Sequence, residues 1–472
     1  MTAPFFRDFL MISEIRTVIA IAVFFALLCI VRLLERRKLP FSARVLVATG
    51  MGLLLGLAVQ AAAGFPEHPL EVVFVNETTK WYGLFGNGFL ALVRMLVIPL
   101  IMVSIVHVII NMHGADIGRL ARNTVALTMV MVLLAAGVGL ALALLFNLGG
   151  GSPAAGEASG IKHVTPAADT LLGLLPANPV GAMVEANIIA LVVFSAFFGA
   201  AAMRMGKKYP DVVKPFNDLV NALHKIIVSV AMYVIKLMPY AVIAMLANTI
   251  AQRGMRGIWE VIRFIGVLYL GLIVMFGIQL LVLAASGLNP LCFVRKAFAP
   301  MIMAFTSRSS VGTLPVTIGT LTGKMGVSEG TANFVASFGS TAGMQGCAGV
   351  FPAMLVVYVA HTSGTHIDAT FLVMSAIVIS IGSLGIAGIP GTATMAASVA
   401  LSGTGMASLF PLISPILAID PIIDMGRSCL NVTGAMVNSL VVDKRLGLLN
   451  REAYAAPTGP ETVEGGEAAL DV

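Results

Sequence analysis

The sequence predicts an all-α protein that crosses a membrane several times. Only 11% of its 472 residues are charged, whereas soluble domains contain about a quarter charged residues. Several apolar runs exceed the roughly 18 residues that mark a membrane-spanning helix. Glycine is abundant, with 48 residues, which favours helices that pack closely in lipid. The net charge of +6 lies in short connections and does not indicate nucleic acid as a partner.

The apolar runs predict seven regular spans followed by a less regular region. The first run is followed directly by "VRLLERRKLP" without a small-residue cleavage site, which predicts a retained helix and not a signal peptide. The predicted spans cover residues 17–34, 43–63, 86–112, 120–146, 180–203, 216–250 and 258–286.

Basic residues predict the orientation, because cytoplasmic loops are enriched in Lys and Arg. An outside N-terminus places 17 basic residues inside and 7 outside, with a cytoplasmic C-terminus. The outside loop that contains Arg253, Arg256 and Arg263 does not fit this distribution. Residues 147–169 are predicted to form a flexible outside loop. Residues 446–472 are predicted to be a disordered acidic tail.

Residues 290–445 alternate apolar runs with small polar breaks. The run 290–321 is interrupted by "TSRSSVGTLP", and the run 370–405 by "GSLGIAGIPGTAT". Both are predicted to be re-entrant helical hairpins, and 330–360 and 409–442 to be broken helices. Backbone breaks within lipid are tolerated only where protein or a water-filled cavity surrounds them. Such a repeat is typical of transporters with inverted repeats, although breaks that serve only helix packing remain an alternative.

The last broken helix carries an unusual polar stripe. Asp420, Asp424, Arg427 and Asn431 are spaced by four, three and four residues, which places them on one helix face. Charged residues inside a span face the protein interior and mark function. An internal ion pair between Asp424 and Arg427 is one interpretation. A site for a ligand that carries both charges, such as an amino acid, is the favoured one.

Arg308 lies at the predicted tip of the first hairpin, among serines with free hydroxyls and amides. Backbone amides at a helix N-terminus attract carboxylates. Arg308 is therefore expected to be a partner for Asp424, for Asp420 or for the substrate. A role in fastening the hairpin to the bundle remains open.

These motifs resemble the dicarboxylate/amino acid:cation symporter family, which includes the glutamate transporters. The resemblance covers about residues 43–444 and is most specific in "SRSSVGTLPVT", "GIAGIPGTAT" and "IDMGRSCLNVTG". Within the family, "GMQGCAG" is most similar to bacterial L-cystine uptake permeases. The resemblance implies a homotrimer that moves substrate by an elevator mechanism. The implied organisation is an extra transmembrane helix and basic cytoplasmic loop in 1–42, a symporter domain in 43–445, and the tail.

The resemblance also implies roles for single residues. Asp424 would bind the substrate ammonium, Arg427 a distal carboxylate, and Asn431 the amino acid end. Ser310 would meet the α-carboxylate, and the second hairpin would act as the outer gate. The implied substrate-binding residues are Ser309, Ser310, Cys347, Ile389, Pro390, Gly391, Asp424, Arg427, Ser428 and Asn431.

Two departures from the family pattern concern sodium. The family usually reads Asn-Met-Asp-Gly-Thr where residues 343–347 read "GMQGC", and Ala435 stands at the position of a sodium-binding Asp. Cys347 replaces a Thr beside the substrate, where it would suit the sulfur-rich centre of cystine or serve packing. The departures favour protons over sodium, with buried carboxylates as carriers. The expected coupling residues are Asp420, Asp424, Arg308, Thr341, Met344, Gln345, Ser383 and Ile386.

The sequence therefore predicts L-cystine import by cation-coupled symport in a bacterial inner membrane. The expected partners are an amino acid, a coupling cation (H⁺ or Na⁺) and membrane lipid, with no cofactor and no metal site assigned. A glutamate/aspartate or C4-dicarboxylate symporter is the alternative within transport, and an anion channel is the alternative of another class. Because the histidines are scattered and neither HExxH nor GxSxG occurs, an enzyme is not predicted.

Overall fold

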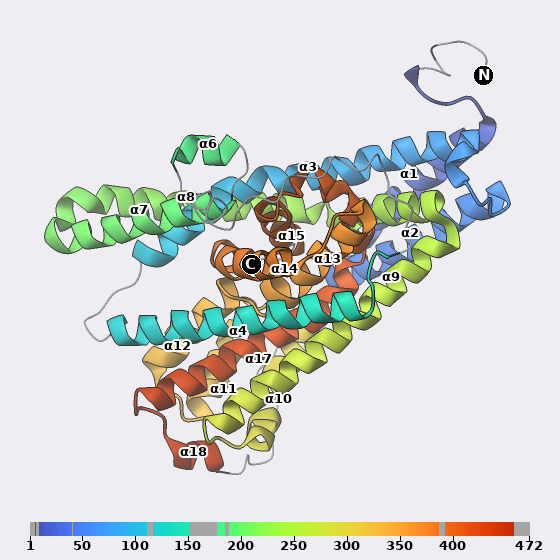
Figure 1. The fold of residues 1–472 in the computed structure, drawn as a ribbon. Helices are drawn as coiled ribbons and strands as arrows, with labels where there is room; N and C mark the ends of the chain where they lie inside the picture. Colours follow the sequence, from blue (N-terminus) through green and yellow to red (C-terminus); the bar gives the residue numbers. More distant parts are fainter. Residues whose placement is uncertain are drawn as a thin grey trace.

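The computed structural model describes residues 5, 9–39, 41–110, 117–150, 177–184, 188–386 and 392–456. The regular elements of these residues are helices, and Figure 1 shows their arrangement. Eight of the described helices are long and apolar enough to cross a membrane. Counting the bent pair Ala407–Ala418 and Asp420–Arg445 as one further span gives nine. The predicted fold class, a polytopic all-α membrane protein, is confirmed.

The first half of the chain consists mainly of long helices. Helix α2 packs closely on α9, because a Cβ on Gly56 would lie 2.7 Å from the Ile250 Cβ. Gly52 and Gly56 are four residues apart, and this small-residue spacing lets membrane helices approach each other. The helices are α1 (Ile15–Arg36), α2 (Phe41–Ala63), α3 (Val73–Ile110), α4 (Ile117–Leu145), α6 (Pro179–Val184), α7 (Ile188–Lys208), α8 (Pro210–Lys236) and α9 (Met238–Ala285).

Helix α3 starts at residue 73, well before the predicted 86. The added turns contain a carboxylate, Glu77, which is 3% exposed. The Ser13 backbone N–H donates to its Oε1 at 2.9 Å, and the Thr17 hydroxyl donates to its Oε2 at 2.6 Å. These bonds satisfy the buried carboxylate in the added turns of α3. Because the donors belong to α1 and the segment just before it, they also fasten α1 to α3.

The predicted span 216–250 is wrong in its second part. Helix α8 ends at Lys236, and α9 begins at residue 238 with Pro239 in its first turn. Proline lacks a backbone N–H and fits the first turn of a new helix. The predicted break between 250 and 258 is a kink at Gly254 (φ 60°, ψ −148°). The predicted span 180–203 is divided between α6 and α7, which continues to residue 208.

The second half of the chain contains the predicted hairpins and broken helices. Helices α10 and α11 pack on each other, as do α14 and α15. The tip of the second hairpin, including the predicted Ile389, Pro390 and Gly391, lies outside the described residues. The elements are α10 (Pro290–Ser307), α11 (Leu314–Gly323), α12 (Glu329–Thr341), η3 (Gly346–Val350), α13 (Phe351–Ser363), α14 (Ala369–Gly382), η4 (Ser383–Gly385), α15 (Thr392–Gly403), η5 (Ala407–Ile413), α16 (Ser414–Ala418), α17 (Asp420–Arg445) and α18 (Arg451–Ala455).

Helix α17 lies at the centre of this half. It contacts α4, α9, α10 and α12 (Figure 1), and most of its residues are buried. Gly339 of α12 lies against Ala435 of α17, where a Cβ on the glycine would be 2.7 Å from the alanine Cβ. Most polar residues of α17, including those of its first half, therefore face protein and not lipid.

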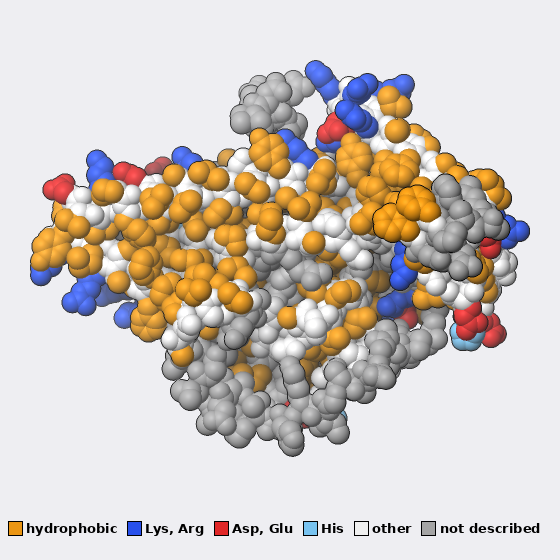
Figure 2. Space-filling model, turned by 90° about the horizontal axis from the view of Figure 1, so that it is seen from above, with side chains coloured by type: hydrophobic (Ala, Val, Ile, Leu, Met, Phe, Trp, Pro, Cys, Tyr) orange, Lys and Arg blue, Asp and Glu red, His pale blue; other side chains and the backbone are white. Residues whose placement is uncertain are grey.

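The outer surface suits a hydrocarbon environment. Figure 2 shows apolar side chains spread over the long face of the molecule, with basic side chains mostly toward its margins. On α7 and α8, the side chains of Phe197, Ile226 and Tyr233 are 72%, 58% and 67% exposed. Apolar patches of this extent occur where a protein meets lipid or another protein. The chain is therefore a multi-pass membrane protein.

The end of the described chain is ordered, which corrects the prediction of disorder from residue 446. Residues 451–455 form α18, which packs on the base of the first hairpin. Lys296, which is 4% exposed, donates to the backbone oxygens of Lys324, Ala453 and Tyr454 at 2.8–2.9 Å. We call these contacts the α18 clasp. The predicted outside loop and the acidic tail lie largely outside the described residues.

Replacement of Lys296 by Met should destabilise the protein by about 2–4 kcal/mol, because three buried carbonyl groups lose a charged donor. The measurement is thermal unfolding of the purified protein in detergent. Arg295→Met, at an exposed position of the same helix, is the matched control and should have little effect. Equal melting temperatures for the two variants would contradict a stabilising role for the clasp.

Candidate functional site

Three charged residues near the start of α17 form a buried ion-pair group. Arg427, which is 0% exposed, donates from Nη2 to Asp424 Oδ1 at 3.0 Å and also contacts Asp420 Oδ1. Asp420 is the first residue of α17, which follows the preceding helical segment at an angle of 87°. A carboxylate at this position interacts favourably with the helix dipole. We call these three residues the α17 triad.

The surroundings of Arg427 explain why it is held inside the protein. Its guanidinium lies 4.2 Å from the centroid of the Phe351 ring, a cation–π arrangement. Gly346 packs on the Arg427 backbone, where a Cβ on the glycine would lie 2.6 Å from the Arg427 carbonyl oxygen. The Nε and Nη1 atoms of Arg427 have no hydrogen-bond partner among the described residues.

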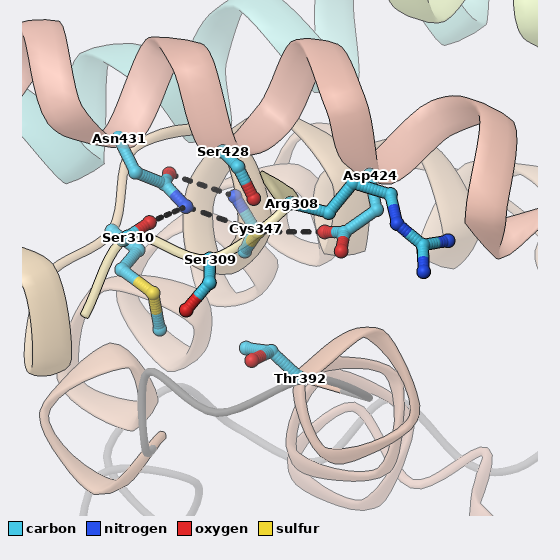
Figure 3. A pocket seen from close by; sticks show the side chains of 9 residues that line it. Arg308, Ser309, Ser310, Cys347, Thr392, Asp424, Ser428 and Asn431 are labelled. Atoms are coloured by element: carbon cyan, nitrogen blue, oxygen red, sulfur yellow. Dashed lines mark hydrogen bonds between the residues drawn. The ribbon is translucent and has the colours of Figure 1, made fainter. Parts of the chain in front are cut away.

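A small cavity lies beside the triad, where the first hairpin, the break after α12, the start of α15 and α17 meet (Figure 3). Its free volume is only about 10 Å³, about what one water molecule needs and far below the roughly 300–1,000 Å³ of typical ligand pockets. A ligand as large as cystine therefore requires the cavity to widen. The lining residues are Arg308, Ser309, Ser310, Met344, Cys347, Thr392, Asp424, Ser428 and Asn431.

Asn431 joins three elements at one end of the cavity. Its Oδ1 accepts from the backbone N–H groups of Gly346 at 2.8 Å and Cys347 at 3.2 Å. Its Nδ2 donates to Cys347 Sγ at 3.1 Å and lies 3.4 Å from Ser310 Oγ. The Cys347 thiol lies 3.7 Å from Asp424 Oδ1. One amide side chain thus aligns the broken helix with α17 and the hairpin tip.

The structure gathers most of the predicted substrate residues and separates one from them. Six of the predicted residues line the same cavity, namely Ser309, Ser310, Cys347, Asp424, Ser428 and Asn431. Arg427 does not line the cavity and is paired with Asp420 and Asp424. Arg308, predicted as a partner for the carboxylates, lines the cavity but has no carboxylate within 4 Å in the described part of the chain.

The predicted coupling residues occupy two places. Met344 lines the cavity, whereas Gln345 lies behind it and accepts at Oε1 from Gln279 Nε2 at 2.7 Å. The Gly343 N–H donates to the Ser383 carbonyl at 3.3 Å, which brings segments 341–344 and 383–386 together. The Thr341 hydroxyl donates to the Ser337 carbonyl of α12 at 2.9 Å, and the Ser383 hydroxyl donates to the Ser380 carbonyl of α14 at 2.7 Å.

Three residues of this region were not predicted from the sequence. Gln279 is the polar residue within the apolar run "GLIVMFGIQLLVLAA", and a polar side chain inside a span is a signal that could have been used. Phe351 under Arg427 carries no such signal, because its partner is defined by tertiary packing. Thr392 lines the cavity from the start of α15.

Comparisons with known proteins agree with this architecture. The profile of the Sodium:dicarboxylate symporter family matches residues 41–445. The L-cystine uptake protein TcyP of Bacillus cereus is 35% identical over 452 residues, covering 92% of this chain and 96% of that protein. The proteins of the same name from Shouchella clausii and Bacillus licheniformis are 35% and 36% identical, covering 93% of this chain and 97% and 96% of theirs.

Replacement of Arg427 by Gln should destabilise the protein by about 3–5 kcal/mol, because two buried carboxylates lose their counter-charge. Adding Asp420→Asn to this variant should restore part of the loss, since the two residues are directly coupled. Thermal unfolding in detergent measures both effects. Additive losses in the double variant would show that the triad is not energetically coupled.

Proposed function

Because the chain belongs to the sodium:dicarboxylate symporter family, we propose that it imports L-cystine together with a cation. The observation that carries the proposal is the buried cavity, which offers a carboxylate, a guanidinium and uncharged donors within one small volume. A zwitterionic amino acid needs this combination of groups. The L-cystine uptake relatives described above support cystine as the amino acid.

The residues of the cavity suggest how one half of the substrate binds. Asp424 accepts from the substrate ammonium. Of the described residues, none accepts a hydrogen bond from the backbone N–H groups of Ser309 and Ser310, so these amides are available to the α-carboxylate. The Asn431 amide lies close to the Ser310 hydroxyl and helps to position it. The Cys347 thiol lies beside the proposed position of the substrate sulfur atoms.

The ion-binding positions support coupling to protons rather than to sodium. Gln345 supplies a neutral oxygen that already accepts from Gln279, and Ala435 packs against Gly339 without an oxygen ligand. Na⁺ binds best to several oxygen atoms with negative charge nearby. In our proposal Asp420 and Asp424 carry the proton. When one of the two carboxylates is protonated, Arg427 pairs with the other.

Several further features belong to the same proposal. The protein is a homotrimer in the bacterial inner membrane, with its N-terminus outside and its C-terminus in the cytoplasm. The first 42 residues add one helix, residues 43–445 form the symporter domain, and the second hairpin with Ile389–Gly391 forms the outer gate. Transport follows an elevator movement of the hairpins and α17 across the membrane.

Uptake of labelled L-cystine into proteoliposomes tests the proposal, with a proton gradient or a sodium gradient imposed separately. We expect accumulation with the proton gradient alone. Accumulation that requires sodium would contradict proton coupling. Uptake of aspartate or a C4-dicarboxylate in place of cystine would favour the alternative symporter, and conduction without accumulation would favour an anion channel.

The variants Asp420→Asn and Asp424→Asn test the proton carriers. We expect at least one of them to flatten the pH dependence of uptake, because an amide cannot bind and release the transported proton. The measurement is the initial rate of cystine uptake across a series of external pH values. A pH dependence that is unchanged in both variants would reject these residues as carriers.

A further inference from the structure

The cavity is lined by an arginine that forms no close ion pair with the described residues. Arg308 is 8% exposed and lines the cavity, and its Nε is buried without a hydrogen-bond partner among the described residues. Its guanidinium carbon lies 5.8 Å from the centroid of the Phe41 ring. Buried charges are ordinarily paired or hydrogen-bonded. Asp424 is near enough to interact with Arg308 electrostatically, but no carboxylate of the described residues lies within 4 Å of its guanidinium.

The backbone at this position supports the same conclusion. Arg308 follows the last residue of α10 in the left-handed conformation, with φ 55° and ψ 33°. Glycine is the usual residue at such a position, and other residues are strained there. Backbone strain of this kind is commonly retained where a side chain has a function. A glycine would end the helix equally well, so the backbone conformation alone does not account for an arginine at this position.

The other arginine of the site has the opposite environment. Arg427 does not line the cavity and is engaged by Asp420 and Asp424. A substrate carboxylate would have to displace one of these side chains to reach it. Arg308 has no such competitor within 4 Å among the described residues, so it is the better placed cation for an incoming anion.

The cavity thus has two carboxylate-binding features at different ends. Figure 3 shows Ser309 and Ser310 on the Asn431 side, whereas the Arg308 side chain extends past Asp424 in the other direction. Cystine carries two carboxylates joined through a disulfide-bridged chain. Building on the proposed function, we infer that Arg308 binds the distal carboxylate of the substrate and thereby selects amino acids with two zwitterionic ends.

The test compares L-cystine with the mixed disulfide of L-cysteine and cysteamine, which lacks only the distal carboxylate. Both compete with labelled cystine for uptake by the purified protein in proteoliposomes. For the wild type we expect the mixed disulfide to bind about 10- to 100-fold more weakly, as expected when one charge-assisted hydrogen-bonded pair is lost. In Arg308→Met we expect the affinity for cystine to fall by a similar factor and the affinity for the mixed disulfide to change little.

Two further variants separate binding from folding. Arg308→Gly removes the side chain and relieves the backbone, so its melting temperature without substrate should equal or exceed that of the wild type. Its discrimination between the two disulfides should nevertheless be lost. Arg295→Met removes an exposed arginine from α10. It should retain the wild-type ratio, by which we mean the affinity for cystine divided by the affinity for the mixed disulfide. Arg308→Lys should retain part of the discrimination.

The outcomes distinguish this inference from the proposed function. Cystine uptake with the wild-type ratio preserved in Arg308→Met would overturn the role of Arg308 alone. Loss of the ratio in Arg427→Lys but not in Arg308→Met would assign the distal carboxylate to Arg427. A lower melting temperature of Arg308→Gly with an unchanged ratio would show that the residue serves only packing on Phe41. A wild-type protein that neither binds nor imports cystine would overturn both proposals.

Discussion

The site is organised by the neutralisation of the charges that α17 carries into an apolar environment. A lone charge at the centre of a span costs about 2.5–3.5 kcal/mol on insertion scales, so Asp420, Asp424 and Arg427 have to be satisfied together. Their contacts require α17 to be surrounded by protein, and its neighbours α4, α9, α10 and α12 provide this. Small residues such as Gly346 and Gly339 let these neighbours come close enough.

The same requirement explains why the cavity lies where it does. The broken helix is fixed beside the triad by Asn431, whose Oδ1 accepts from the backbone N–H groups of Gly346 and Cys347. The first hairpin supplies Arg308, whose charge opposes that of the nearby carboxylates without forming a close pair. The group formed by two carboxylates and two arginines is balanced as a whole. A neutral zwitterion can enter such a group without adding net charge to the membrane interior.

Much of this arrangement could be predicted from the sequence, for identifiable reasons. Gly, Ser and Pro breaks within apolar runs are strong signals, because lipid offers no hydrogen bonds to an interrupted backbone. The spacing of the α17 residues predicted their common face. The start of α3 was missed because the partners of Glu77 lie some 60 residues earlier. The different environments of Arg308 and Arg427 depend on which carboxylates each reaches after folding, and sequence spacing does not contain that information.

The α18 clasp has a consequence for the order in which the chain is completed. Lys296 is synthesised 157 and 158 residues before two of the carbonyl groups that finally hold it. At roughly 5–20 residues per second, the lysine waits roughly 8–30 s for these partners. During that interval the Lys296 ammonium lacks two of its final hydrogen-bond acceptors, so the α18 clasp can form only when synthesis is nearly finished. Proteins that associate with the nascent chain would thus encounter the first hairpin before the α18 clasp has formed.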